Sequence, residues 1–256
     1  MILAIDIGNS NVVIGFVQDR KVLHKVRIAT DVKKTSDQYW MDLKNSLELF
    51  GYKAEDIEGA ILASVVPPVL NSCRTAIKKL TGMEPLVIGP GVKTGINIRT
   101  DNPAQVGSDL ITAAVAAVKE YPLPLLIVDM GTATTISAID ASGSFLGGSI
   151  SPGVKISAEA LSGRTAQLPG ISLEAPKHAI GRNTIDCMQS GSMLGAAAML
   201  DGMIARMEKE LGEKATVVAT GGIARYVIPM CEREIIYDND LLLKGLVILY
   251  ENNKKC

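Results

Sequence analysis

Two short segments combine an acidic residue with a glycine and small polar side chains directly after an apolar run. They are Asp6-Ile7-Gly8-Asn9-Ser10-Asn11 and Asp129-Met130-Gly131-Thr132-Ala133-Thr134-Thr135. A glycine lets the backbone come close to a phosphate, and consecutive turn amides can bind an anion. A carboxylate beside a phosphate needs a cation between them, and Mg²⁺ in such places keeps several waters. Taken alone, the first segment is explained equally well as a tight hairpin turn.

The elements that must position these segments are two similar hairpins. Residues 2–7 and 12–17 are apolar and β-branched on either side of the first turn, and residues 125–129 and 135–139 flank the second. This pattern predicts a β-hairpin in each case. The two copies lie about half the chain apart, and a further strand follows each hairpin. Such a repeat predicts two similar α/β domains that face each other across a cleft.

Other stretches supply helices and strands around the hairpins. Residues 36–51 carry Trp40, Leu43, Leu47 and Phe50 along one stripe, which predicts a helix. Pro122 and Pro124 end a helix that starts near Asp109. We therefore expect an N-terminal domain of residues 1–118 and a C-terminal domain of residues 119–256. The remaining predicted elements are strands over 22–28, 57–66 and 85–89 and a helix over 69–81.

A third segment, Ala219-Thr220-Gly221-Gly222-Ile223-Ala224, follows a predicted strand over 216–218 and opens a short helix. Paired glycines leave room for a flat adenine ring against bare backbone, although a simple strand-to-helix turn also uses them. Its position after the second hairpin favours a nucleotide site. The chain has neither a GxxxxGK(S/T) loop nor a GxGxxG loop after a strand, so the two commonest nucleotide motifs are missing.

In this order, DIGNSN, DMGTATT and TGG resemble the phosphate-1, phosphate-2 and adenosine motifs of the acetate and sugar kinase, Hsp70 and actin superfamily. Within it, the chain is similar to the type III pantothenate kinases over nearly its whole length. The resemblance implies a duplicated actin-like (ribonuclease H-like) α/β fold, with two similar domains flanking a nucleotide cleft. It also implies ATP-dependent phosphorylation of pantothenate to 4'-phosphopantothenate, the first step of coenzyme A biosynthesis. The further segments that carry it are DNPAQVGSD at 101–109, GGSISPG at 147–153, RTAQLP at 164–169 and GRNT at 181–184.

The same resemblance assigns roles to individual residues. Asp109 is the implied catalytic base, and Asp129 would hold a monovalent cation, potassium or ammonium. Asp6 suits Mg²⁺ bound through water. A homodimer is implied, in which the region 153–169 helps to complete the pantothenate pocket. The implied ATP-binding residues are Asp6, Ile7, Gly8, Asn9, Ser10, Asn11, Val12, Val13, Thr132, Gly221 and Gly222, and the implied pantothenate-binding residues are Thr100, Gly107, Ser108, Asp109, Leu110 and Thr184.

Two positions depart from the family's pattern. Leu110 stands where the family often has arginine, and Thr100 where it often has tyrosine. Arginine binds a carboxylate with two parallel hydrogen bonds and leucine cannot. Another small-molecule kinase of the same superfamily, acting on a sugar or a short acid, therefore stays open, as does a nucleotide-binding regulator that transfers nothing. Arg99, Arg164 and Arg182 are candidate anion binders or simply solvated surface residues.

Asp109 also has a purely structural interpretation. It lies where an apolar-periodic segment begins, which is a good place for an N-cap carboxylate. Both roles can coexist if only one carboxylate oxygen caps the helix. A second ambiguity concerns residues 190–211, a long helical segment rich in small residues and methionine. Its packing surface suits either a homodimer contact or burial against its own sheet.

Composition excludes several other classes of protein. The net charge of −1 gives no cationic face for nucleic acid. No apolar run approaches the roughly 20 residues that span a bilayer, and the first residues lack a basic n-region. Cys73, Cys187, Cys231 and Cys256 are scattered without a CxxC pair. These features predict a cytoplasmic enzyme with a small-molecule substrate and neither a nucleic-acid nor a membrane partner.

Overall fold

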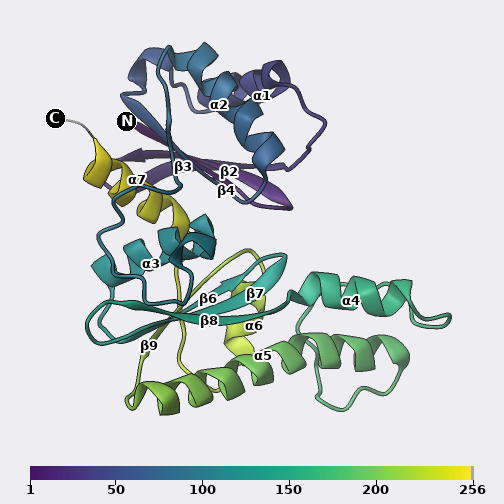
Figure 1. Cartoon of the computed structure of the whole chain (residues 1–256). Coiled ribbons are helices and arrows are strands. Elements are labelled where there is room, and N and C mark those ends of the chain that lie inside the picture. The colour runs from purple at the N-terminus through teal and green to yellow at the C-terminus, as the bar shows by residue number, and fades with distance from the viewer. Residues whose placement is uncertain (255–256) are drawn as a thin grey trace. The chain divides into compact units, whose positions relative to one another are not determined.

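A computed structural model of the chain describes residues 1–254, and it is drawn in Figure 1. It consists of two compact units. The first contains residues 1–96, 101–119 and 240–254, and the second contains residues 97–100 and 120–239. The expected C-terminal domain of residues 119–256 differs from this division, because the chain from Asp240 onward packs with the first unit. Cys256 lies outside the described residues.

The first unit is built on a five-stranded sheet with the order β3-β2-β1-β4-β5. β1 is antiparallel to β2 and parallel to β4. In the turn between β2 and β3, Asp19 and Arg20 both have positive φ, as a two-residue hairpin turn matched to strand twist requires. The strands are β1 (Ile2–Ile7), β2 (Asn11–Gln18), β3 (Lys21–Ala29), β4 (Gly59–Ser64) and β5 (Leu86–Val87). The helices are α1 (Ser36–Leu49), α2 (Pro67–Thr81), α3 (Ser108–Glu120) and α7 (Leu241–Asn253), with 3₁₀ turns at Ala54–Asp56 and Pro103–Gln105.

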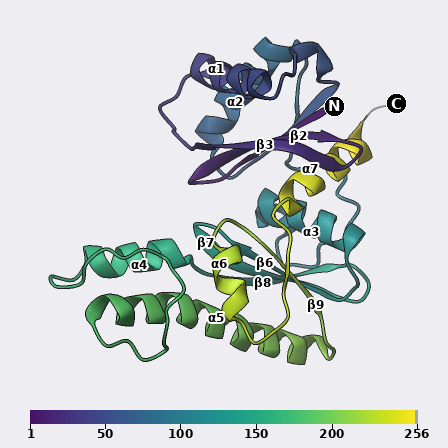
Figure 2. The ribbon, with the colours of Figure 1, turned by 180° about the vertical axis from the view of Figure 1, so that it is seen from behind.

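α1 and α2 lie side by side on one face of this sheet, as Figure 1 and Figure 2 both show. The apolar residues of β1 that point to this face, Leu3, Ile5 and Ile7, are fully buried in the core between sheet and helices. α2 begins at Pro67, two residues before the predicted start, because prolines in the first helical turn have no amide that needs a partner.

The opposite face of the first sheet receives α7. A side chain at Gly15 of β2 would collide with Leu243, and one at Gly59 of β4 would collide with the Tyr250 ring. These two glycines therefore leave the space that α7 fills. Contacts so distant along the chain cannot be read from a local pattern, which is why residues 241–253 were expected in the C-terminal domain.

The second unit repeats the architecture with the strand order β10-β9-β6-β7-β8. Read in chain order within each unit, the two sheets have the same arrangement and the same strand directions, so the predicted duplication is confirmed. The strands are β6 (Leu125–Met130), β7 (Ala133–Ile139), β8 (Phe145–Pro152), β9 (Thr216–Thr220) and β10 (Ile236–Tyr237). The helices are α4 (Val154–Gly163), α5 (Thr184–Leu211) and α6 (Ala224–Val227), with a 3₁₀ turn at Ile228–Met230.

The two hairpin turns differ in length. Residues 8–11 lie between the paired residues Ile7 and Val12, whereas only residues 131–133 lie between Met130 and Thr134. The sequence predicted that this strand starts at Thr135, but β7 starts two residues earlier, at Ala133. As a result, Thr135 is the structural counterpart of Val13.

α5 is longer than the predicted helix over 190–211. It begins at Thr184, where the Asn183 side chain accepts a hydrogen bond from the Asp186 amide and so caps the first turn. The face that carries Met193, Leu200 and Ile204 is buried against the second sheet. Burial against its own sheet is therefore what the structure shows for that face. Within residues 1–254, no helix is long and apolar enough to cross a membrane.

Candidate functional site

Hydrogen bonds within the turn between β1 and β2, and from Thr30 beside it, fix the backbone of this turn. The Gly8 amide donates to the Asn11 carbonyl at 3.0 Å. Thr30, directly after β3, donates its hydroxyl to the Gly8 carbonyl at 2.7 Å and its amide to the Ser10 carbonyl at 3.0 Å. Asn9 and Ser10 at the tip are exposed. Sequence reasoning missed Thr30, and only its place beside the end of the predicted hairpin could have indicated this bracing role.

Asp6 lies at the carboxyl end of β1, half-buried, between Val13 of β2 and Ala63 of β4. Because successive side chains in a strand point to opposite faces, Asp6 lies on the face away from the core formed by Ile5 and Ile7. The implied ATP-binding residues Ile7 and Val12 are themselves core residues. They can therefore offer a nucleotide only their backbone.

The start of α3 is tethered to the same edge of the same sheet. The Ser108 hydroxyl donates to the Ser64 carbonyl at the end of β4, with an oxygen–oxygen distance of 3.3 Å. Ser64 is paired with Ile7, the last residue of β1. Adjacent strands lie only about 4.8 Å apart. The structure thus brings the segment that carries Asp109 to the edge where Asp6 and its turn lie.

Asp109 is the second residue of α3 and not its N-cap, because the helix begins at Ser108. One carboxylate oxygen accepts a hydrogen bond from the Leu110 amide at 2.9 Å and so satisfies a free first-turn donor. Within residues 1–254 the other oxygen has no protein partner, and the side chain is half-buried. A side chain at Gly107 would collide with this carboxylate. One oxygen of Asp109 can therefore stabilise the first turn of α3 while the other acts as a base.

In the second unit, three glycine-containing segments meet with almost no space between their backbones. A Cβ on Gly221, whose φ is +96°, would lie 2.5 Å from the Met130 carbonyl oxygen and 2.8 Å from an Asp129 carboxylate oxygen. The Gly153 amide, just before α4, donates to the Thr132 carbonyl at 3.0 Å. Only glycine permits such close approach. The structure therefore gathers Asp129, the predicted cation ligand, with Thr132 and Gly221, two predicted ATP-binding residues, at one end of the second sheet.

Thr100 and Thr184 lie elsewhere in this unit. Thr100 belongs to a short stretch that runs along β8, where the Arg99 amide donates to the Phe145 carbonyl at 2.8 Å. Its hydroxyl oxygen is buried and has no hydrogen-bond partner among the described residues. Thr184 is the exposed first residue of α5. None of the described contacts joins either residue to Asp129.

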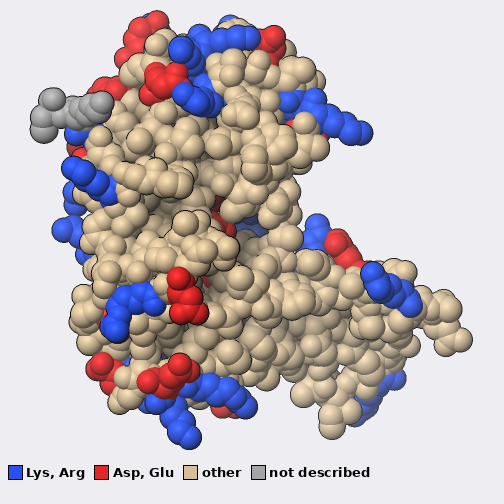
Figure 3. Space-filling model, in the orientation of Figure 1, with Lys and Arg blue, Asp and Glu red and all other residues tan. Residues whose placement is uncertain are grey.

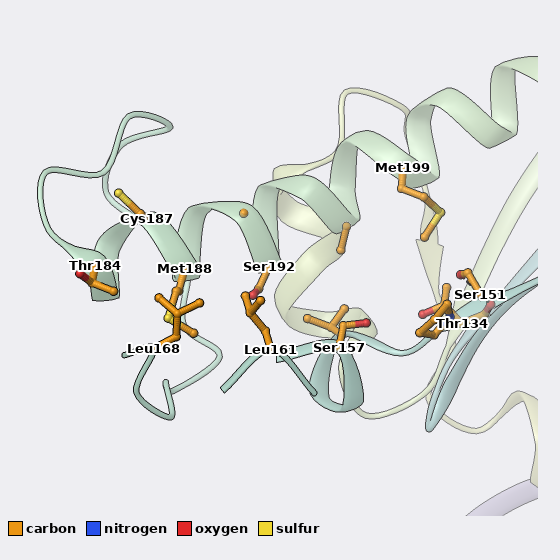
Figure 4. Close-up of a pocket in the computed structure, with 14 residues that line it drawn as sticks. Thr134, Ser151, Ser157, Leu161, Leu168, Thr184, Cys187, Met188, Ser192 and Met199 are labelled. Atoms are coloured by element: carbon orange, nitrogen blue, oxygen red, sulfur yellow. Dashed lines mark hydrogen bonds between the residues drawn. The ribbon is translucent and has the colours of Figure 1, made fainter. Parts of the chain in front are cut away.

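A groove of about 630 Å³ runs between α4 and the first half of α5. Figure 4 shows Thr184 at one end of it and Thr134 at the other, with Met188 and Ser192 between them. Half of its lining residues are aliphatic or thioether, including Val154, Leu161, Leu168 and Met199, and serine and threonine hydroxyls lie among them. The groove is therefore a largely apolar surface that the chain itself leaves uncovered.

The candidate anion-binding arginines have no defined site. Arg99 contacts Asp140 at 3.4 Å. The Ser142 hydroxyl, the Ser144 and Ser142 amides and Arg99 together hold the pKa of Asp140 below its ordinary value. Arg164 and Arg182 are exposed. Arg99 therefore belongs to the turn around Asp140.

The family model of the type III pantothenate kinases matches residues 2–206 of this chain. The chain belongs to this family. A type III pantothenate kinase from Exiguobacterium sibiricum is 48% identical over 254 residues, which cover 99% of this chain and 100% of that relative. The resemblance drawn from the motifs of the sequence is confirmed.

The fold of this chain is similar to that of several solved structures. A Campylobacter jejuni protein described as a candidate Baf family transcriptional activator has a TM-score of 0.62 at 20% identity and covers 98% of both chains. The activator of 2-hydroxyisocaproyl-CoA dehydratase from Clostridium difficile, solved with ADPNP, has a TM-score of 0.56 at 15% identity, covering 98% of this chain and 94% of that one. At these identities the likeness concerns the fold alone, and it confirms the duplicated actin-like architecture.

The residues at the two strand ends can be compared with the cations that the resemblance implies. Within residues 1–254, no three His, Cys, Asp or Glu side chains gather as a metal cluster. Asp6 and Asp129 each stand as a single carboxylate at a strand end. Beside Asp129 lies Thr135, whose hydroxyl oxygen is buried and has no hydrogen-bond partner among residues 1–254. A cation at either place would draw its other ligands from hydroxyls, water or phosphate oxygens.

Proposed function

We propose that this protein transfers the γ-phosphoryl group of ATP to the primary hydroxyl of pantothenate, the entry step to coenzyme A. Family membership supports the reaction. The observation that carries the proposal at the level of residues is the tether from Ser108 to Ser64. It holds Asp109 at the sheet edge that also bears Asp6 and the turn at 8–11.

In this proposal the chain's own groups divide the work of phosphoryl transfer. The amides of residues 8–11, with Thr132, bind the phosphates, and the Gly221-Gly222 backbone lies against the adenosine. The carboxylate oxygen of Asp109 that is not bonded to the Leu110 amide orients the pantothenate hydroxyl and takes its proton as the new P–O bond forms and ADP leaves. In a loose transition state this orientation is the main task. Mg²⁺ held through water by Asp6, and a monovalent cation at Asp129, would offset the phosphate charge when bound.

An ADP-release assay with and without pantothenate tests this function. We expect ADP to form only when pantothenate is present, in a buffer that contains Mg²⁺ and potassium. The same assay with a panel of sugars and short acids shows whether the enzyme prefers another acceptor. This alternative is open because Thr100 and Leu110 depart from the family's pattern. Tight nucleotide binding without acceptor-dependent ADP release would instead favour a regulator that transfers nothing.

Leu110 offers a direct probe of substrate binding. We expect Leu110→Arg to lower the KM for pantothenate by about tenfold and to leave the KM for ATP nearly unchanged, because a charge-assisted hydrogen bond to a carboxylate contributes about 1.5–3 kcal/mol. Steady-state kinetics with each substrate varied in turn measures both constants. Leu49→Arg, on the exposed side of α1 where Leu49 is 70% exposed, is the matched control. An unchanged pantothenate constant would mean that another residue already holds the carboxylate.

The implied homodimer is supported by the groove between α4 and α5. Leu161, which lines this groove, is 43% exposed. On the face drawn in Figure 3, the surface between the charged side chains along the upper edge of α4 and those near the start of α5 is uncharged. A second copy of the chain could cover this apolar surface and bring the region 153–169 to its partner's substrate pocket.

We therefore expect a dimer in sedimentation at micromolar concentration. Leu161→Glu should shift the protein toward monomer, because a charge in an apolar contact loses its hydration without a partner. Leu49→Glu on α1 should leave the dimer intact. A wild-type monomer at micromolar concentration would contradict the shared-pocket arrangement.

A cytosolic setting without nucleic-acid or membrane partners completes the proposal. The net charge of −1 supplies no cationic surface for phosphate backbones. The described cysteines, Cys73, Cys187 and Cys231, are free thiols, as a reducing compartment would keep them.

A further inference from the structure

Asp129 lies in the middle of a row of three polar residues on adjacent strands. Thr135 of β7 is its direct partner across the antiparallel pair, and Thr220 of β9 is its partner across the parallel pair. Residues paired in register point to the same face of a sheet, with Cβ atoms roughly 4.5–5.5 Å apart in an antiparallel pair. The carboxylate of Asp129 is therefore flanked on both sides by threonine side chains.

The first unit provides an internal comparison, because its sheet has the same order. There Asp6 occupies the position of Asp129, and its partners in register are Val13 and Ala63. The two repeats thus share the acid but differ in its neighbours. Apolar side chains flank the first acid, and hydroxyls flank the second.

The hydroxyl of Thr135 is unusual because it is buried but unpaired within the described part of the chain. Its oxygen is buried and makes no hydrogen bond with any described residue, so it is not bonded to the neighbouring Asp129 either. A buried hydroxyl without a partner is destabilising compared with an apolar group of the same shape. Valine, which stands at the equivalent position of the first unit, has that shape. A bound ligand that interacts with this hydroxyl would offset the cost of burying it without a protein partner.

We infer that the Thr135 hydroxyl is a ligand of the monovalent cation that Asp129 holds, with Thr220 on the other side of the carboxylate. This inference rests on the proposed function and adds residues to its cation site. A carboxylate and neutral hydroxyl oxygens form a hard, oxygen-only donor set of low charge, which suits a monovalent cation. The partners of Asp6 in register, Val13 and Ala63, carry no hydroxyl, and Mg²⁺ beside a single carboxylate keeps its waters.

A phosphate oxygen is a poorer occupant of the same position. Asp129 would repel it, whereas a cation is attracted to the carboxylate and can accept the lone pairs of both side chains at once. The assignment thus explains why the hydroxyl and the carboxylate lie side by side without bonding to each other.

The test compares Thr135→Val with wild type by thermal melting in the presence of ATP and Mg²⁺, without pantothenate. Each protein is melted in potassium chloride and in choline chloride at equal ionic strength. We expect wild type to melt at a higher temperature in potassium. Thr135→Val should lose this increment, yet melt in choline at the wild-type temperature or above it, because the unsatisfied hydroxyl is gone. The potassium concentration for half-maximal ADP release should rise at least about tenfold.

Two further variants separate a ligand from a merely structural residue. Thr135→Ser keeps the hydroxyl and should restore most of the potassium response. Thr216→Val removes a threonine from the first position of β9, paired with Leu125 at the far end of the strand from Asp129, and should respond like wild type. The inference is overturned if Thr135→Val keeps the full potassium increment, if it loses ATP affinity while the increment stays, or if Thr216→Val loses the increment equally. Failure of the kinase function would show separately, as ADP release that does not depend on pantothenate.

Discussion

Replacing Asp109 with asparagine is expected to lower turnover by roughly 10²–10⁴-fold, the range for loss of a general base. Asparagine keeps one oxygen that can accept the hydrogen bond from the Leu110 amide, so the first turn of α3 should hold. The KM for ATP and the melting temperature should therefore stay close to wild type. Turnover in the ADP-release assay and a thermal melt measure the two effects separately.

Asp37 provides the matched control. It is the second residue of α1, the same helical position that Asp109 has in α3, and its carboxylate pairs with Lys79 at 2.6 Å on the surface. Asp37→Asn should cost at most about 1 kcal/mol of stability, as exposed ion pairs do, and should not change the rate. Near-parental turnover in Asp109→Asn would remove Asp109 as the base and leave only its role in the first turn.

Gly221→Ala is expected to reduce kcat/KM for ATP by about 10²-fold. A methyl group there would lie 2.5 Å from the Met130 carbonyl oxygen and 2.8 Å from the Asp129 carboxylate. The end of β6 would have to move by roughly 1 Å, and a misplacement of that size at a phosphoryl-transfer site costs about that factor. Kinetics with ATP varied, and a nucleotide-binding isotherm, measure the change.

The variant also places a Cβ on a left-handed residue, which by itself costs about 1–2 kcal/mol. Gly212→Ala isolates that part, because Gly212 has a φ of +81° but no atom within 4 Å of the added Cβ. We expect Gly212→Ala to lose stability and keep its affinity for ATP. If both variants bind ATP equally well, the close contact at Gly221 has no role in the nucleotide site.

Much of the site could be predicted because its signals are local. An acid, one apolar residue and a glycine after a buried strand define each hairpin end, and the strands, the turns and the Gly221-Gly222 step follow from spacing within a few residues. Family motifs then added Asp109, whose own neighbourhood indicates only the start of a helix. The predicted start of α3, near Asp109, is one residue later than the observed start at Ser108, which is an ordinary uncertainty at helix ends.

The rest depends on contacts between distant parts of the chain. Thr30 braces the first turn only because β3 ends beside it. The position of Thr135 opposite Asp129 depends on a turn one residue shorter than its counterpart, which a gap-free alignment of the two repeats cannot reveal. The packing of α7 depends on Gly15 and Gly59 facing Leu243 and Tyr250. In each of these two pairs, the glycine and its contact lie too far apart in the sequence for a local pattern to connect them.

The return of α7 to the first unit also sets an order of events on the ribosome. Synthesis usually lets the N-terminal part of a protein fold first. Here a nascent chain that has reached Asn239 holds every residue of the second unit, whereas the first unit still lacks Leu243 and Tyr250. The unit whose synthesis begins first is therefore the last to be completed. Until then, the face of β1, β2 and β4 that α7 will cover stays exposed to water.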